Sequence, residues 1–160
     1  MRKGRLLIAA VALAACAKNE AAKTDSAAPA AAAATPAAPT AVTAADMVGT
    51  VNGKVMAQNS DSVLSNFTCT TAATGTVSKC VNGSAPKDTV DYTYTLSGAD
   101  SVTWTSAAHT PPVPPKSPKV IDHVTGRLAA GKWTGTIVTV LASKPDSVLS
   151  RTRWEATKTQ

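Results

Sequence analysis

The sequence has few of the residues from which catalytic and metal sites are usually built. Histidine occurs only twice, as His109 and His123, and the ten acidic residues are scattered singly along the chain. Catalysis by a nucleophile and its base, by paired carboxylates or by a metal ion requires such groups in combination. The nine glycines form no phosphate-binding loop either. We therefore expect no catalytic residue, no metal site and no cofactor, and we do not expect an enzyme.

The two histidines stand where ordinary structural roles suffice. His109 directly precedes the proline-rich stretch 110–118, and His123 follows Asp122 on an expected strand. Adjacent residues of a strand project to opposite faces, so Asp122 and His123 are not expected to act together. Each histidine is expected to be satisfied locally or to face solvent.

Aromatic residues are scarce as well, at 4% of the chain, and they do not alternate with basic residues. Proteins that stack nucleic-acid bases need such interleaving, so nucleic acid is not an expected partner despite the net charge of +6. Residues 47–160 hold eleven basic and seven acidic residues, and most of the excess follows Pro115. This asymmetry favours a basic face for an anionic partner.

The chain opens with a basic segment and a short apolar run. Arg2, Lys3 and Arg5 precede Leu6 to Leu13, a run shorter than the roughly 20 residues that cross a bilayer. The tetrapeptide that follows is Leu13-Ala14-Ala15-Cys16.

This tetrapeptide resembles the lipobox of bacterial lipoproteins. The resemblance implies that residues 1–15 are a signal peptide and that Cys16 becomes the mature N-terminus, carrying diacylglycerol and a further acyl chain such as palmitate. The protein would then be a lipid-anchored membrane protein of the bacterial cell envelope, because two or more acyl chains anchor stably. Ala17, rather than aspartate, follows the cysteine. By the sorting rule of these lipoproteins, this favours the outer membrane, facing the periplasm.

Alanine, proline and threonine dominate the next segment, residues 16–46. Pro29, Pro36 and Pro39 interrupt the alanine runs. We expect a disordered linker, although alanine could also form a short helix between the prolines.

Residues 47–160 are expected to form a single all-β domain. Alternation is clearest at Thr89 to Ser97, where Val90, Tyr92, Tyr94 and Leu96 share one face. Eight strands are predicted, at Val48–Ala57, Ser62–Cys69, Thr76–Val81, Thr89–Ser97, Ser101–Ala107, Lys119–Leu128, Lys132–Ala142 and Ser147–Lys158. Most connections are short, which favours an up-and-down antiparallel meander that forms a small barrel or a sandwich.

Two hairpins have registers that can be predicted. Pairing Leu96 with Val102 also places Tyr94 opposite Trp104. In the second hairpin, pairing Leu128 with Trp133 also opposes Gly126 to Gly135 and Val124 to Ile137, so the sheet is expected to bend at the glycines. In the last strand, Trp154 is expected to point inward, and Arg151 and Arg153 outward.

The tripeptide Gly131-Lys132-Trp133 is similar to the Gly-x-Trp of lipocalins. In lipocalins it opens the first strand, whereas here it falls in the seventh expected strand. The resemblance therefore implies only a similar type of β-barrel.

A short phrase recurs at strand beginnings. Asp61-Ser62-Val63-Leu64-Ser65 is repeated unchanged at residues 146–150, and related Asp-Thr-Val and Asp-Ser-Val triplets begin at Asp88 and Asp100. Aspartate that ends a turn can accept hydrogen bonds from nearby backbone amides, which explains the phrase by turn chemistry. Duplication of an ancestral hairpin is an equally good explanation.

Cys69 and Cys80 remain once Cys16 is assigned. They lie symmetrically about Thr74-Gly75, so a hairpin would bring them opposite each other on adjacent strands. In an exported protein an even pair predicts a disulfide, and the spacing is not that of a redox or metal site.

The first functional hypothesis is a non-catalytic binding module for a small or amphipathic ligand. An eight-stranded barrel has an interior just wide enough for one small ligand. The candidate lining residues are the aromatic ones, Trp104, Trp133, Trp154, Tyr92 and Tyr94, although tryptophan in a domain with so few aromatic residues more often belongs simply to the core.

The alternative is an interaction or inhibitor-type lipoprotein that docks an envelope protein, peptidoglycan or anionic lipid. Its expected interaction face comprises Lys119, Lys132, Arg151 and Arg153. The overall plan is similar to that of the membrane-bound lysozyme inhibitors, which are small lipidated β-barrels. A purely structural envelope lipoprotein also fits the sequence.

Overall fold

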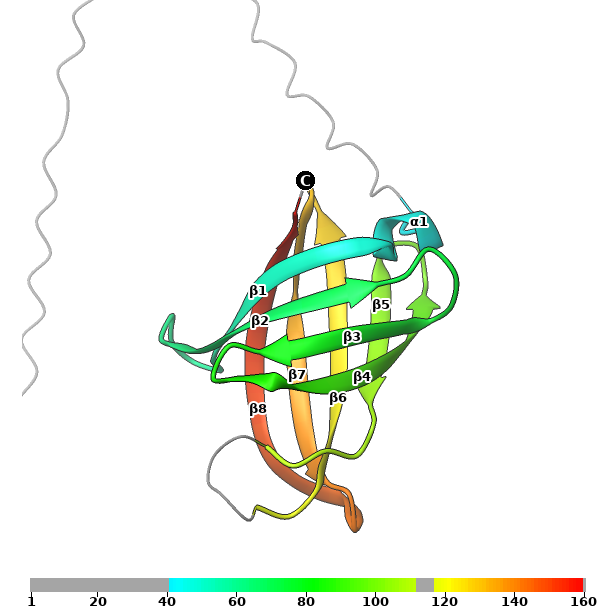
Figure 1. The fold of residues 1–160 in the computed structure, drawn as a ribbon. Helices are drawn as coiled ribbons and strands as arrows, with labels where there is room; N and C mark the ends of the chain where they lie inside the picture. Colours follow the sequence, from blue (N-terminus) through cyan, green and yellow to red (C-terminus); the bar gives the residue numbers. More distant parts are fainter. Residues whose placement is uncertain (1–40, 112–116, 160) are drawn as a thin grey trace, which may run out of the picture. The chain divides into compact units, whose positions relative to one another are not determined.

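The computed structural model describes residues 41–111 and 117–159, in which eight antiparallel strands close into a barrel (Figure 1). The expected all-β meander is therefore confirmed, and the barrel is realised rather than the sandwich. The elements are α1 (Ala44–Met47), β1 (Gly49–Ala57), β2 (Val63–Thr71), β3 (Val77–Asn82), β4 (Ala85–Ser97), β5 (Ser101–Ser106), β6 (Val120–Ala129), β7 (Lys132–Leu141) and β8 (Lys144–Lys158). The predicted signal peptide, Cys16 and the linker as far as residue 40 lie outside the described residues.

Each strand pairs with its neighbours in sequence, and β1 also pairs with β8 to close the barrel. Because successive strands run in opposite directions, β2, β4, β6 and β8 all begin at the same end of the barrel. We call this the entry end. Helix α1 and the last residues of β8 lie at the opposite, closed end (Figure 1).

The predicted hairpin registers are confirmed. Leu96 pairs with Val102 and Tyr94 with Trp104, and in the β6–β7 hairpin Gly126 lies opposite Gly135. The turn between β6 and β7 has positive φ at both Ala130 and Gly131 (49° and 75°). Two such residues are what a two-residue hairpin turn needs to match the twist of the strands.

Three boundaries differ from the expectation by more than two residues. Strand β4 begins at Ala85 and β8 at Lys144, so Asp88 and Asp146 lie within strands rather than at the ends of turns. The predicted linker also extends too far, since α1 begins at Ala44 and Val42 is already buried in the core. The Val42 amide donates to the Ala99 carbonyl at 2.6 Å, which ties this segment to the β4–β5 turn.

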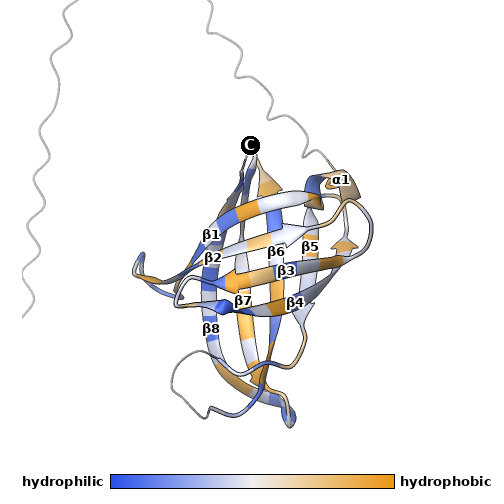
Figure 2. Ribbon diagram, viewed as in Figure 1, coloured by the Kyte–Doolittle hydropathy of each residue, from blue (hydrophilic) through white to orange (hydrophobic). Residues whose placement is uncertain are grey.

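Apolar and polar segments alternate along the strands, as expected for a sheet with one face inward (Figure 2). The buried core lies toward the closed end, where Met47 of α1 packs with Val102, Trp133 and Trp154. No helix within residues 41–111 and 117–159 is long and apolar enough to cross a membrane.

Candidate functional site: a cavity inside the barrel

The barrel encloses a cavity of about 410 Å³, lined by inward-facing residues of all eight strands and by Met47 of α1. We call it the barrel cavity. Leu64, Asp88 and Pro111 line it at the entry end, and Leu64 is 59% exposed. The cavity is therefore reached from the entry end, while α1 covers the closed end.

The three tryptophans form a cluster, here called the tryptophan cluster, that borders the cavity on its closed side. Trp104 makes edge-to-face contacts with both Trp133 and Trp154, with ring centroids 5.7 and 5.6 Å apart. All three line the cavity, yet Trp133 and Trp154 also belong to the buried core. The lining role and the core role are thus combined in the same side chains.

Gly126 of β6 and Gly135 of β7, which lie opposite each other, leave space for the tryptophan cluster. A methyl group at Gly126 would lie 2.6 Å from Trp154 Cζ2 and 2.9 Å from Trp104 Cζ3. A methyl group at Gly135 would overlap the Thr125 carbonyl oxygen and approach Trp154 Nε1 to 2.7 Å. The Trp154 indole N–H donates to that same carbonyl at 3.0 Å. Glycine is therefore required here because an aromatic ring presses against the backbone.

The two tyrosines proposed as ligand-binding residues occupy different places. Tyr92 lines the barrel cavity, whereas Tyr94 is buried in the core and its hydroxyl donates to the Gly75 carbonyl at 3.2 Å. Tyr94 instead borders a more open depression beside α1, outside the barrel cavity. The structure thus separates Tyr94 from the other four candidates.

A polar cluster on the cavity wall centres on Asp122. Its Oδ2 accepts a hydrogen bond from the Tyr92 hydroxyl at 2.8 Å, and its Oδ1 accepts one from the Thr139 hydroxyl at 2.6 Å. His109 Nε2 lies 3.6 Å from Oδ2, and the Asp122 and His109 side chains are only 13% and 18% exposed. These residues, together with Ser106, form what we call the Asp122 cluster.

Ser106 and His109 complete the cluster at the end of β5. The Ser106 hydroxyl accepts the backbone N–H of Asp122 at 2.8 Å and lies 3.4 Å from His109 Nδ1. His109 Nδ1 also lies 3.2 Å from the Ala107 carbonyl oxygen. His109 thus has local partners, as expected, and His123 is exposed.

Burial and the neighbouring charge shift the ionisation of Tyr92. The pKa of its phenol is raised well above 10, first because the side chain is buried and second because the Asp122 carboxylate lies beside it. The phenol therefore remains a hydrogen-bond donor to Asp122 throughout the physiological range.

The Asp122 cluster was not expected from the sequence. One signal was present, because Asp122 shares its strand face with Val124, and apolar residues of a half-buried strand point inward. The approach of His109 carried no such signal, since it depends on the isolated bridge between His109 and Val120, the first residue of β6.

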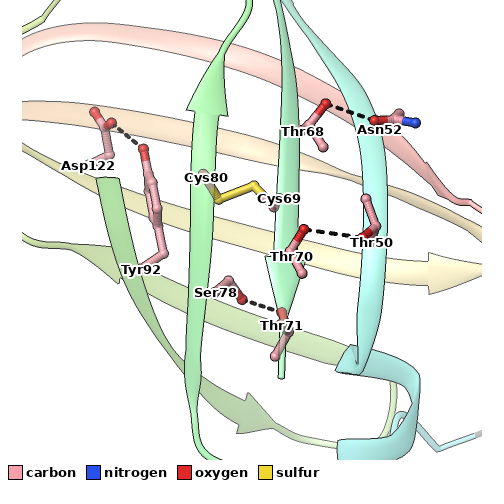
Figure 3. Close-up of a disulfide and its surroundings, with 10 residues drawn as sticks. All are labelled: Thr50, Asn52, Thr68, Cys69, Thr70, Thr71, Ser78, Cys80, Tyr92 and Asp122. Carbon is pink, nitrogen blue, oxygen red and sulfur yellow. Dashed lines mark hydrogen bonds between the residues drawn. A yellow bond between two sulfur atoms is a disulfide. The ribbon is translucent and has the colours of Figure 1, made fainter. Parts of the chain in front are cut away.

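The predicted disulfide is present and forms part of the cavity wall. Cys69 and Cys80 are directly opposite each other on β2 and β3, with Cα atoms 4.0 Å apart (Figure 3). Figure 3 also shows Tyr92 reaching toward Asp122 across the neighbouring strands. Cys69 and Cys80 both line the cavity.

The structure does not bring the four basic candidates together. Arg151 and Arg153 point outward from β8, as predicted, but Lys132 and Lys119 flank opposite ends of the β6–β7 hairpin. Two of the four are also held by acidic partners. Lys132 Nζ lies 2.5 Å from Glu155 Oε2, and Arg153 Nη2 lies 3.0 Å from Asp61 Oδ1.

The Arg153 guanidinium has a structural task in addition to this ion pair. It donates to the backbone carbonyls of Ala57 and Ser60 at 3.3 and 2.8 Å, and so fastens the β1–β2 turn to β8. Lys119 and Arg151 are exposed. These four residues therefore do not form a continuous basic face.

Among residues 41–111 and 117–159, no group of three or more histidine, cysteine or carboxylate side chains is placed to hold a metal ion. Comparison of the chain with protein-family models, with curated proteins and with solved structures finds no match. The barrel cavity is therefore the feature of the molecule from which a function can be inferred.

Proposed function

We propose that the protein is a non-catalytic binding module that holds a small amphipathic ligand inside its barrel. The observation that carries this proposal is the barrel cavity of about 410 Å³. Ligand cavities in proteins commonly measure roughly 300 to 1,000 Å³ and combine an apolar lining with a few placed polar groups.

The lining has this two-sided character. Apolar surface comes from the disulfide, from the tryptophan cluster and from Phe67, Val90 and Ile137. Tyr92 and Asp122, which also line the cavity, supply polar groups that form hydrogen bonds. A ligand with an apolar body and one polar group satisfies both kinds of surface.

The Asp122 cluster supports binding rather than catalysis. Ser106 is 5% exposed and its oxygen is occupied by the backbone N–H of Asp122, so it is poorly placed to attack a substrate. His109 faces Ser106 through Nδ1 and Asp122 through Nε2, so both ring nitrogens face protein groups. We assign these residues to shaping and polarising the cavity wall.

The lipobox-like tetrapeptide supports a location for this module. We propose that Cys16 is lipidated and anchors the barrel in a bacterial envelope membrane, most simply the outer membrane, with the linker between anchor and barrel. Mass spectrometry of the chain recovered from bacterial membranes tests this. A mature protein beginning at acylated Cys16 is expected, and a chain cleaved elsewhere without acyl chains contradicts it.

Ligand binding is tested with N-phenyl-1-naphthylamine, an uncharged apolar probe whose fluorescence rises in an apolar site. The full chain with its disulfide intact should bind one equivalent. V90W fills the cavity from β4 and should reduce the binding at least tenfold. T93W, an exposed position on the same strand, is the matched control and should bind like the wild type.

Saturable binding that V90W removes and T93W preserves supports the proposal. Absence of saturable binding by the folded wild-type chain overturns it, as does binding that both variants retain equally. The wild-type titration keeps the test decisive even if V90W fails to fold.

A further inference from the structure

The charge of the barrel cavity is opposite to the charge of the chain. Residues 47–160 hold eleven basic and seven acidic residues, yet the described residues that line the cavity include Asp46, Asp88 and Asp122 and no lysine or arginine. His109 is the one basic side chain among those lining residues. The described lysine and arginine residues thus all lie outside the cavity lining.

The three aspartates do not contribute equally. Asp46 belongs to the capping box of α1, where it accepts hydrogen bonds from the backbone and side chain of Thr43 at 2.8 Å each. Asp88 is exposed at the entry end. Asp122 lies deeper, with its carboxylate bonded to two hydroxyl groups, and therefore sets the charge of the inner wall.

The hydrogen bonds to Asp122 leave its charge and part of its bonding capacity available. An ionised carboxylate offers about four acceptor positions. Tyr92 and Thr139 fill one on each oxygen, and His109 Nε2 lies 3.6 Å from Oδ2, which leaves at least one position on Oδ1 open. Hydroxyl groups solvate the negative charge without cancelling it. The raised pKa of Tyr92, caused first by burial and then by Asp122, is consistent with a buried site that carries a negative charge.

The apolar part of a ligand has a defined place beside this carboxylate. The next inward residue after Asp122 on β6 is Val124, and it lies opposite Ile137 of β7. This apolar pair lies nearer the tryptophan cluster than Asp122 does. Along a strand, successive inward residues are about 7 Å apart. A cationic group near Asp122 thus leaves the attached apolar chain pointing toward the tryptophans.

We propose that the ligand of the barrel cavity is an amphipathic cation, such as an alkylamine, whose charged group binds the Asp122 carboxylate while its apolar chain occupies the deeper wall. This inference rests on the proposed function and adds the ligand's charge to it. Charged hydrogen bonds are roughly twice as strong as neutral ones, so an ammonium group gains more from Asp122 than a hydroxyl group does.

The test compares octylamine, octanol and octanoate, which share an apolar chain and differ in the charge of the head group. Each displaces N-phenyl-1-naphthylamine from the full chain at neutral pH. Octylamine should bind at least tenfold more tightly than octanol, and octanoate more weakly than either. This comparison needs no variant.

Two substitutions then locate the effect. D122N keeps an oxygen for one hydroxyl donor but removes the charge, and should reduce the advantage of octylamine over octanol to less than threefold. D91N is the matched control, since Asp91 faces outward on β4 and pairs with Lys79 at 3.5 Å. It should leave the tenfold advantage unchanged.

The outcomes separate this inference from the proposed function. If the probe binds but octylamine is no better than octanol, or octanoate is the tightest ligand, or D122N keeps the full preference, the cation proposal is overturned and the binding module stands. If the probe itself does not bind to the folded wild-type chain, both proposals are overturned.

Discussion

Removal of the Cys69–Cys80 disulfide should cost the barrel a large part of its stability. The bridge closes a loop with a sequence separation of 11, and the chain-entropy relation gives about 2.8 kcal/mol at 25 °C for a loop of that length. The double substitution C69A/C80A also removes two sulfur atoms from the cavity wall, and the contacts of those atoms with their neighbours are lost. We expect a total loss of about 3 to 4 kcal/mol.

Urea unfolding followed by tryptophan fluorescence measures this loss. The midpoint should fall, and the dependence of the free energy on urea should stay equal or increase, because the unfolded chain without the cross-link is more expanded. In the wild type, an added thiol that reduces the bridge should reproduce most of the effect.

The matched control is T70A/K79A. Thr70 and Lys79 form the next pair along β2 and β3 but face outward, and both are exposed. Their removal should cost less than about 1 kcal/mol, as is usual for exposed positions. A loss below 1 kcal/mol in C69A/C80A, or an equal loss in the control, would refute the argument that the bridge stabilises the β2–β3 hairpin.

Three further predictions concern the backbone and a buried phenol. G135A should destabilise the barrel by about 3 kcal/mol, measured by urea unfolding, because the added methyl group overlaps the Thr125 carbonyl; a variant as stable as the wild type contradicts this. A130N should stabilise the fold by about 0.5 to 1 kcal/mol, seen as a higher melting temperature, because asparagine tolerates the positive φ of 49° better than alanine; no gain would argue against strain at this turn. Stability should fall as the pH rises above about 10, where an unfolded tyrosine loses its proton while folded Tyr92, with its raised pKa, keeps it. Between pH 8 and 11 the unfolding free energy of Y92F should fall less than that of the wild type. An equal fall in the wild type and in Y92F would contradict this role of Tyr92.

Local patterns predicted the fold because a barrel of short hairpins is specified by nearby residues. Alternation located all eight strands, and complementary pairs such as Leu128 with Trp133 specified the register of the β6–β7 hairpin. The symmetric placement of Cys69 and Cys80 about a turn predicted their bridge in the same way. In each case the informative residues are close together in the chain.

Only part of the Asp122 cluster follows from local patterns. Thr139 is the cross-strand partner of Asp122 in the β6–β7 hairpin, so the predicted register already places these two residues opposite each other. Tyr92 and Ser106 come from the β4–β5 hairpin, and the hydrogen bond from Tyr92 to Asp122 depends on how the closed sheet curves. The same holds for Val42, whose burial depends on α1 covering one end of the barrel. Contacts across the interior follow from barrel closure, which no local pattern encodes.

The scarcity of aromatic and other large residues nevertheless accounts for where the cavity lies. An eight-stranded barrel has a fixed interior width, so each layer must be filled by large side chains or remain partly empty. At the closed end, three tryptophans fill the interior, and facing glycines are needed to admit them. Nearer the entry end, several of the inward positions are held by small hydroxyl residues that line the cavity, namely Ser65, Thr139, Ser150 and Thr152. Placing large side chains at one end and small polar ones at the other therefore yields a rigid base with a chamber above it.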